Sequence, residues 1–106
     1  MEYYDNPKTP EEKTMALLSG YNGFILSDQV KTQKTVAQIN MALQTIQDDP
    51  YYPIIPLKFF EGMSMESIAE HMGIHLRTAI RKRKRLIRQL AKILCSDEVI
   101  DIIYEK

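Results

Sequence analysis

Apolar residues in the first half of the chain recur at helical spacing and predict two helices. The run Thr9-Pro10-Glu11-Glu12 is typical of a helix start, with threonine as N-cap, proline at the first helical position and the second glutamate completing a capping box. We expect glycines at Gly20 and Gly23 to interrupt this helix, and Ser27-Asp28 to offer a second start. From Val30 to about residue 47, apolar residues at spacings of three and four predict an amphipathic helix: Val36, Ile39, Leu43 and Ile46.

Prolines and glycines divide the second half into shorter helical segments. The run Asp48-Asp49-Pro50 ends the preceding helix and is the best candidate boundary in the chain. A helix is expected from about Pro53 to Gly62, because Pro56 fits only a first turn and glycine is the usual residue after a helix end. The last short helix is expected to begin near Ser96-Asp97-Glu98 and has four apolar residues: Val99, Ile100, Ile103 and Tyr104.

Between these segments the chain has the spacing of a helix-turn-helix. Ser64 is expected to cap a short helix over residues 65–72, in which Ala69 is small enough for two helices to cross closely. Gly73, four residues later, supplies a left-handed turn that glycine adopts at low cost. The segment from Leu76 to Leu94 contains no glycine or proline and is about 28 Å long if it is wholly helical. Since no strand pattern or repeat is found, the predicted fold is all-α.

The positions of the charges along the chain are more informative than the net charge. The chain has 106 residues, and fourteen Lys and Arg balance fourteen Asp and Glu to a formal net charge of zero. This length fits one compact domain, or two small lobes that share a core, and does not fit a large enzyme. Eight cations and no acid lie between Arg77 and Lys92, which leaves the rest of the chain at −8. On a helical wheel of residues 76–94 the apolar residues occupy one broad arc, and the opposite arc contains a polar set: Arg77, Thr78, Arg81, Arg85, Arg88 and Lys92.

This cationic helix face predicts contact with DNA. An α-helix fits the major groove of B-DNA, where arginine binds guanine O6 and N7 in bidentate fashion. Residues nearest the helix N-terminus are expected to approach base edges: Arg77, Thr78, Arg81 and Lys82. Residues further along the helix are expected to bind phosphates and set the register: Arg85, Arg88 and Lys92. His75, at the cap of the helix, and Lys84, in the same basic run, are also expected to contact DNA. Ser64, with Lys58, is expected to add phosphate contacts at a helix N-terminus.

Several of these motifs occur together in a known family. An aromatic-rich segment ends in Glu61-Gly62, the pattern Ser64-x-x-x-Ile68-Ala69-Glu70-x-x-Gly73-Ile74 follows, and a basic helix containing Thr78 comes next. With these motifs, residues 51–94 resemble region 4 of sigma-70-type factors. A chain of this length with a helical first half resembles the small phage-encoded transcriptional regulators of the ArpU and RinA type. The resemblance implies control of late or packaging-gene transcription in the cytoplasm of a bacterial host.

Two residues depart from the sigma-like pattern. His75 stands where serine or threonine usually caps the second helix, and it is a weaker N-cap. Arg83 stands where an aliphatic residue is common, in the middle of the apolar arc. Either its head pairs with an acid while its stem lies along the core, or the helix leaves the core at that point. We favour the ion pair, with three candidate acids: Glu61, Glu66 and Glu70.

No catalytic, metal or cofactor site is expected. His71 and His75 are four residues apart, but Gly73 separates them and no third ligand is close in sequence. Cys95 has no partner for catalysis and is expected to be a small buried residue, and a single cysteine indicates a reducing compartment. The N-terminus is acidic and no apolar run approaches roughly 18 residues, so we expect neither a signal peptide nor a membrane span.

Three parts are therefore expected along the chain. Residues 1–49 form an N-terminal helical region for oligomerisation, residues 50–94 form the region 4-like helix-turn-helix domain, and residues 95–106 form an acidic C-terminal helix. A lone helix-turn-helix reads about half a site, so a homodimer through the helix at residues 30–47, aided by the last helix, is preferred. Docking of the acidic, apolar ends on RNA polymerase is the alternative.

The predicted function is sequence-specific regulation of transcription on double-stranded DNA. Two alternatives stay open at this point: a DNA-packaging subunit similar to small terminases, and a sigma-like module that docks on RNA polymerase. The acidic C-terminal residues 95–106 add a further hypothesis, in which they shield the basic helix when no DNA is bound.

Overall fold

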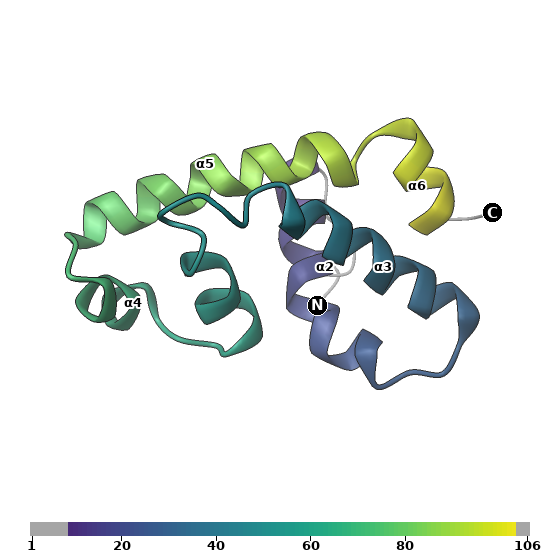
Figure 1. The fold of residues 1–106 in the computed structure, drawn as a ribbon, viewed down its shortest axis with the longest axis horizontal. Coiled ribbons are helices and arrows are strands. Elements are labelled where there is room, and N and C mark those ends of the chain that lie inside the picture. The colour runs from purple at the N-terminus through teal and green to yellow at the C-terminus, as the bar shows by residue number, and fades with distance from the viewer. Residues whose placement is uncertain (1–8, 104–106) are drawn as a thin grey trace.

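Every regular element in the described part of the chain is helical. A computed structural model describes residues 9–103 of this protein (Figure 1), so the predicted contribution of Tyr104 lies outside the described residues. The elements, in chain order, are α2 (Pro10–Ile25), α3 (Val30–Gln44), η1 (Pro56–Phe60), α4 (Met65–Met72), α5 (Leu76–Leu94) and α6 (Asp97–Ile103). The predicted all-α fold is confirmed.

Helix α2 begins as predicted and ends later than predicted. The Thr9 hydroxyl accepts a hydrogen bond from the Glu12 backbone N–H at 3.0 Å, and the Glu12 carboxylate accepts one from the Thr9 N–H at 3.1 Å. The expected interruption at Gly20 and Gly23 is wrong, because the helix continues through both residues. The ring of Phe24 lies over Gly20, where an added Cβ would stand 2.7 Å from its Cζ, so the glycine makes room for this ring. Tertiary packing outweighs the weak helix propensity of glycine here.

Helix α3 has the predicted inner face and begins at Val30 as predicted, but it ends earlier than predicted and is not capped by Ser27 or Asp28. Gln29 is the N-cap and makes no side-chain cap hydrogen bond, while the Ser27 hydroxyl accepts from the Gln29 N–H at 3.2 Å within the preceding turn. The helix ends at Gln44, and turns continue through residue 48. The apolar face predicted for this segment is buried at Ile39, Leu43 and Ile46, and Val36 is half-buried.

The segment before α4 is not the ordinary α-helix that was expected. A short helical turn at residues 54–55 leads into η1, a π-helix in which the Glu61 N–H donates to the Pro56 carbonyl at 3.0 Å. Proline at the first position of η1 has no N–H to leave unpaired. Gly62 ends the segment at a φ of 71°, in the left-handed region that glycine adopts at low cost.

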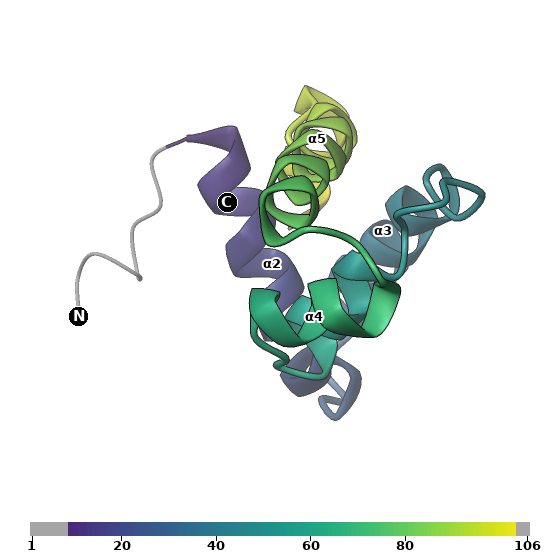
Figure 2. The ribbon, with the colours of Figure 1, turned by 90° about the vertical axis from the view of Figure 1, so that its left-hand side faces the viewer.

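Two apolar clusters lie along the length of α5. The larger cluster joins α2, α3, the second half of α5 and α6, with fully buried residues such as Leu18, Ile39 and Leu90. The smaller cluster joins α4, the first half of α5 and the segment before η1, around Ile68 and Ala79. Figures 1 and 2 show α5 as the long helix of the molecule, with α4 beneath its beginning and α2 and α3 beside its later turns. Within residues 9–103, no helix is long and apolar enough to cross a membrane.

Candidate nucleic-acid interface

Helices α4 and α5 are joined by a tight turn with the geometry that the sequence predicts. The Ser64 hydroxyl caps α4 by accepting a hydrogen bond from the Ser67 N–H at 3.1 Å. Gly73 has φ 68° and ψ 34°, and the Ile74 N–H donates to the Ala69 carbonyl at 3.0 Å. This is the hydrogen bond of a helix end closed by a left-handed glycine. The turn therefore reverses the chain within a few residues and starts α5 at Leu76.

Small residues hold α4 closely against the first half of α5. Ala69 of α4 is 4% exposed, and Ala79 of α5 is fully buried in the same cluster as Ile68. Ile74 packs against this cluster from the turn. Because α4 occupies the inner side of α5 here, the opposite side of α5 faces outward.

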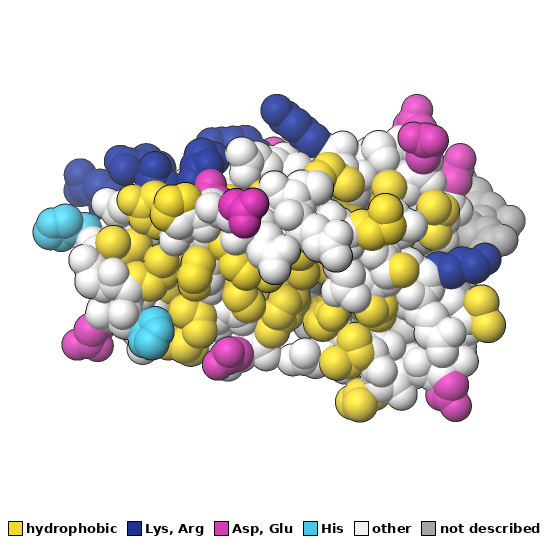
Figure 3. All heavy atoms as spheres, in the orientation of Figure 1, with side chains coloured by type: hydrophobic (Ala, Val, Ile, Leu, Met, Phe, Trp, Pro, Cys, Tyr) yellow, Lys and Arg dark blue, Asp and Glu magenta, His cyan; other side chains and the backbone are white. Residues whose placement is uncertain are grey.

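The outward side of α5 presents a continuous row of cations. Five exposed residues follow one another at spacings of four, three, four and four, and we call this row the cationic stripe: Arg77, Arg81, Lys84, Arg88 and Lys92. From Arg77 to Lys92 the helix rises by fifteen residue steps, so the stripe extends about 22 Å. Figure 3 shows Lys and Arg side chains as a band along the upper edge of the molecule, over the early and middle turns of α5. The structure thus brings five of the predicted DNA contacts onto one face.

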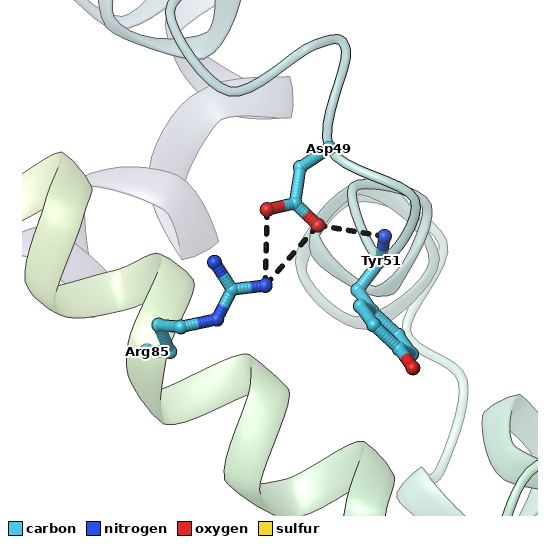
Figure 4. Close-up of polar contacts among 3 residues, drawn as sticks. All are labelled: Asp49, Tyr51 and Arg85. Atoms are coloured by element: carbon cyan, nitrogen blue, oxygen red, sulfur yellow. Dashed lines mark hydrogen bonds and ion pairs between the residues drawn. The ribbon is translucent and has the colours of Figure 1, made fainter.

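Two of the predicted DNA-contacting residues, Arg85 and Lys82, instead interact with other residues of the protein. Arg85 Nη2 lies 2.9 Å from Asp49 Oδ2 and donates a hydrogen bond to Oδ1 at 3.2 Å (Figure 4). Lys82 Nζ lies 4.8 Å from the ring centroid of Tyr51, a cation–π distance. Both partners belong to the turns after α3, which cover this flank of α5. Arg85 was expected on phosphates and Lys82 near bases, but the fold uses both to hold the α3–η1 connection on α5.

Asp49 is the charged anchor of this connection. Its partial burial raises the pKa of the carboxyl, but the Tyr51 backbone N–H and the Arg85 guanidinium outweigh that effect, so the net pKa lies below its usual value. The Tyr51 N–H donates to Asp49 Oδ1 at 2.8 Å, as Figure 4 shows. Sequence reasoning identified Asp48-Asp49 only as a helix end, because nothing local indicates a partner thirty-six residues away.

The ion pair expected for Arg83 is wrong. None of the three candidate acids forms an ion pair with it within residues 9–103, and all three are exposed. Arg83 is instead half-buried in a shallow hollow on the α2 side of α5, beside Glu11, Met15 and Ile87. The acids considered from the sequence lie in the segment leading to α4 and on α4 itself, whereas the middle of the apolar arc faces the start of α2.

The other predicted site residues are placed as follows. His75 is an exposed N-cap without a side-chain hydrogen bond, as its weak capping ability predicts. Thr78 is half-buried on α5, and Ser64 is exposed at the start of α4. Cys95 is half-buried rather than buried, and its Sγ lies 3.6 Å from the Pro10 carbonyl oxygen. Among residues 9–103, no group of three or more His, Cys, Asp and Glu is arranged to hold a metal ion.

Comparison with known proteins gives no family assignment. No protein-family model matches the chain, and searches of curated proteins and of solved structures give no match either. The resemblance to sigma region 4 therefore stays a prediction.

Proposed function

We propose that this protein binds double-stranded DNA in a sequence-specific manner and regulates transcription, as a phage or prophage regulator. The proposal rests on the cationic stripe on the exposed side of α5. The stripe contains no acid and lies opposite the helix that packs on the first half of α5. A helix supported from behind by a shorter helix, with a basic outer face, has the arrangement that major-groove readers use.

The positions of the stripe residues along α5 suggest which of them would contact bases and which would contact phosphates. Arg77 and Arg81 lie in the first two turns of α5, in the half that packs only against the smaller cluster, and they would read base edges in the groove. Arg88 and Lys92 lie two to three turns further on, beside the bulk of the molecule, and would bind phosphates. Lys84 lies between these two pairs.

The internal pairing of Arg85 supports the same division. Because Asp49 neutralises Arg85, this cation contributes little to the field that DNA meets. The five stripe residues remain as the free cations of this helix face, so binding would depend on few phosphate contacts. Each contacted phosphate contributes a slope of about −0.9 to the dependence of log affinity on log salt.

Fluorescence anisotropy on a duplex selected from a random library tests this function. We expect Arg81→Ala to relax the sequence preference at one or two positions, at a cost of about 1–3 kcal/mol on the selected site. We expect Lys92→Ala to weaken binding to all duplexes alike and to reduce the salt slope by about one.

Lys13→Ala is the matched control, since Lys13 is a partly exposed cation on α2, outside the stripe. It should leave both the affinity and the sequence preference unchanged. If the chain binds no duplex at about 50 mM salt, where phosphate contacts are strong, the proposed function is wrong. Equal losses from Lys13→Ala and Arg81→Ala would show that only net charge matters and would reject α5 as the reader.

A further inference from the structure

Exposed apolar side chains lie at the connection between α2 and α3 and along the outer side of α3. Of the large apolar residues at the surface, Leu26 is 85% exposed, Val30 65% and Met41 60%, and Ile25 lies beside them in sequence. All four belong to α2, α3 and their connection. Hydrophobic side chains come to the surface at the lower right of Figure 3, away from the band of cations. An apolar surface of this kind on a small protein is typical of an interaction site.

Helix α3 has a second face that no other element within residues 9–103 covers, although α6 lies beside it. Its inner face is buried through Thr35, Ile39 and Leu43. On the opposite side, four exposed residues follow one another at spacings of four, three and four, and we call them the α3 seam: Val30, Lys34, Ala37 and Met41. Alternating spacings of three and four are those of a coiled-coil contact line. The seam therefore has the periodicity of a helix that packs on another helix.

The charges beside the seam are complementary to those of the same surface in a second copy. A hollow of about 380 Å³ separates α3 from α6 and is lined by Lys34, Ala37, Gln38, Asp101 and Ile102. Helix α3 contains lysines and no acid, whereas α6 has exposed acids at Asp97, Glu98 and Asp101. A surface that is basic on one helix and acidic on its neighbour matches itself under a two-fold rotation.

We propose that the α3 seam is the interface of a homodimer in which two copies of α3 pack antiparallel and cross at Ala37. In this register Ala37 meets its own copy, where a small side chain permits close approach. Val30 lies opposite the partner's Gln44, and Met41 inserts between the partner's Lys34 and Gln33. Lys34 lies away from the partner's Lys34 and can approach the partner's Asp101. Parallel packing in register would instead bring the two Lys34 side chains together, which is unfavourable.

The dimer is expected to be weak. The seam includes a lysine and an alanine, so it buries less apolar area than a seam built of large aliphatic residues. A lysine at such a seam position lowers stability and selects the register.

Sedimentation equilibrium of the full chain without DNA tests the interface. The wild type should shift from 12.3 kDa toward twice this mass as its concentration rises. Met41→Lys should raise the dissociation constant at least about tenfold, because it places a second positive charge beside the partner's Lys34. Ser19→Lys places the same charge on an exposed position of α2 and should leave dimerisation unchanged. A wild type that stays monomeric, a ring of many chains, or a Met41→Lys variant that dimerises like the wild type would each overturn the proposal.

Disulfide trapping tests the orientation. In a Cys95→Ser background, Ala37→Cys should form a covalent dimer on oxidation, because the crossing brings the two residues 37 together. Val30→Cys should not, since its counterpart lies at the far end of the antiparallel pair, and efficient cross-linking at residue 30 would overturn the antiparallel arrangement. Since neither experiment contains DNA, its failure leaves the proposed function standing, and a failure to bind DNA leaves the dimer standing.

Discussion

The first half of α5 packs on α4 and is flanked by the connection after α3, whereas the second half is enclosed by α2, α3 and α6. Residues 76–85 include six of the eight cations of the helix and have Ala79 as their one fully buried residue. Residues 86–94 include two cations, while Leu86, Leu90 and Leu94 are fully buried. One uninterrupted helix thus changes from a projecting, charged element to a core element. Charge density follows exposure, because an unpaired cation is costly wherever the helix is enclosed.

The largest expected effect distinguishes the two cores that α5 joins. Leu90→Ala removes a fully buried side chain from the larger cluster and should lower the free energy of unfolding by about 2–5 kcal/mol. Urea unfolding followed by circular dichroism measures this loss. A loss below about 1 kcal/mol would show that the site collapses around the smaller side chain.

Ile68→Ala is the matched substitution in the smaller cluster. Because few buried residues hold α4, we expect α4 to open locally while the larger cluster stays folded. Hydrogen exchange should then lose protection in α4 and the first turns of α5, and keep it in α3. Equal loss of protection in α3 would show that the two clusters unfold as one cooperative unit and do not differ in local stability.

A smaller effect is expected at the turn that sets α4 against α5. Gly73→Ala introduces a side chain at a φ of 68° and should cost about 1 kcal/mol of stability, together with a loss of DNA affinity. Gly23→Ala is the matched control, since a Cβ there meets nothing within 4 Å and the residue is helical. It should stabilise the protein by up to about 1 kcal/mol. Opposite signs in thermal unfolding are expected, and a neutral Gly73→Ala would contradict the constrained turn.

The smallest effect concerns the ion pair that ties the middle of α5 to the connection after α3. Arg85 is 36% exposed, so solvent screens the pair, and Asp49→Asn should cost no more than about 1 kcal/mol. The folded state lowers the pKa of Asp49, so the pair contributes fully above the ordinary aspartate pKa and is lost as the pH falls below about 4.

Urea unfolding of both proteins between about pH 3 and pH 7 checks this sign. The difference in stability between wild type and Asp49→Asn should be largest near neutrality and should shrink toward the acidic end. A difference that grows as the pH falls would mean that Asp49 is not the group that titrates.

Local signals were sufficient for the elements around the candidate site. The caps at Thr9 and Ser64, the left-handed glycine at Gly73 and the unbroken run to Leu94 each depend on a few neighbouring residues, and each is confirmed. The exception among local signals is Gly20, where the ring of Phe24 makes a glycine compatible with a continuing helix.

Partners from distant parts of the chain could not be identified in the same way. From the sequence alone, Arg83 matches acids near α4, because the position of α2 is not known, and Arg85 counts as free, because Asp49 marks only a helix end. For α3, the spacing of the apolar residues identified the inner face correctly, but only the packed structure shows that no other element within residues 9–103 covers the outer face.

By itself, the sequence determined the helical class, the turn between α4 and α5 and the concentration of cations on α5, since capping, glycine conformation and helical periodicity act within a few residues. The tertiary structure alone decided which of those cations remain free. Whether a charged side chain pairs depends on which segment folds across its helix, and the turns after α3 fold across Lys82 and Arg85 but leave the stripe from Arg77 to Lys92 exposed.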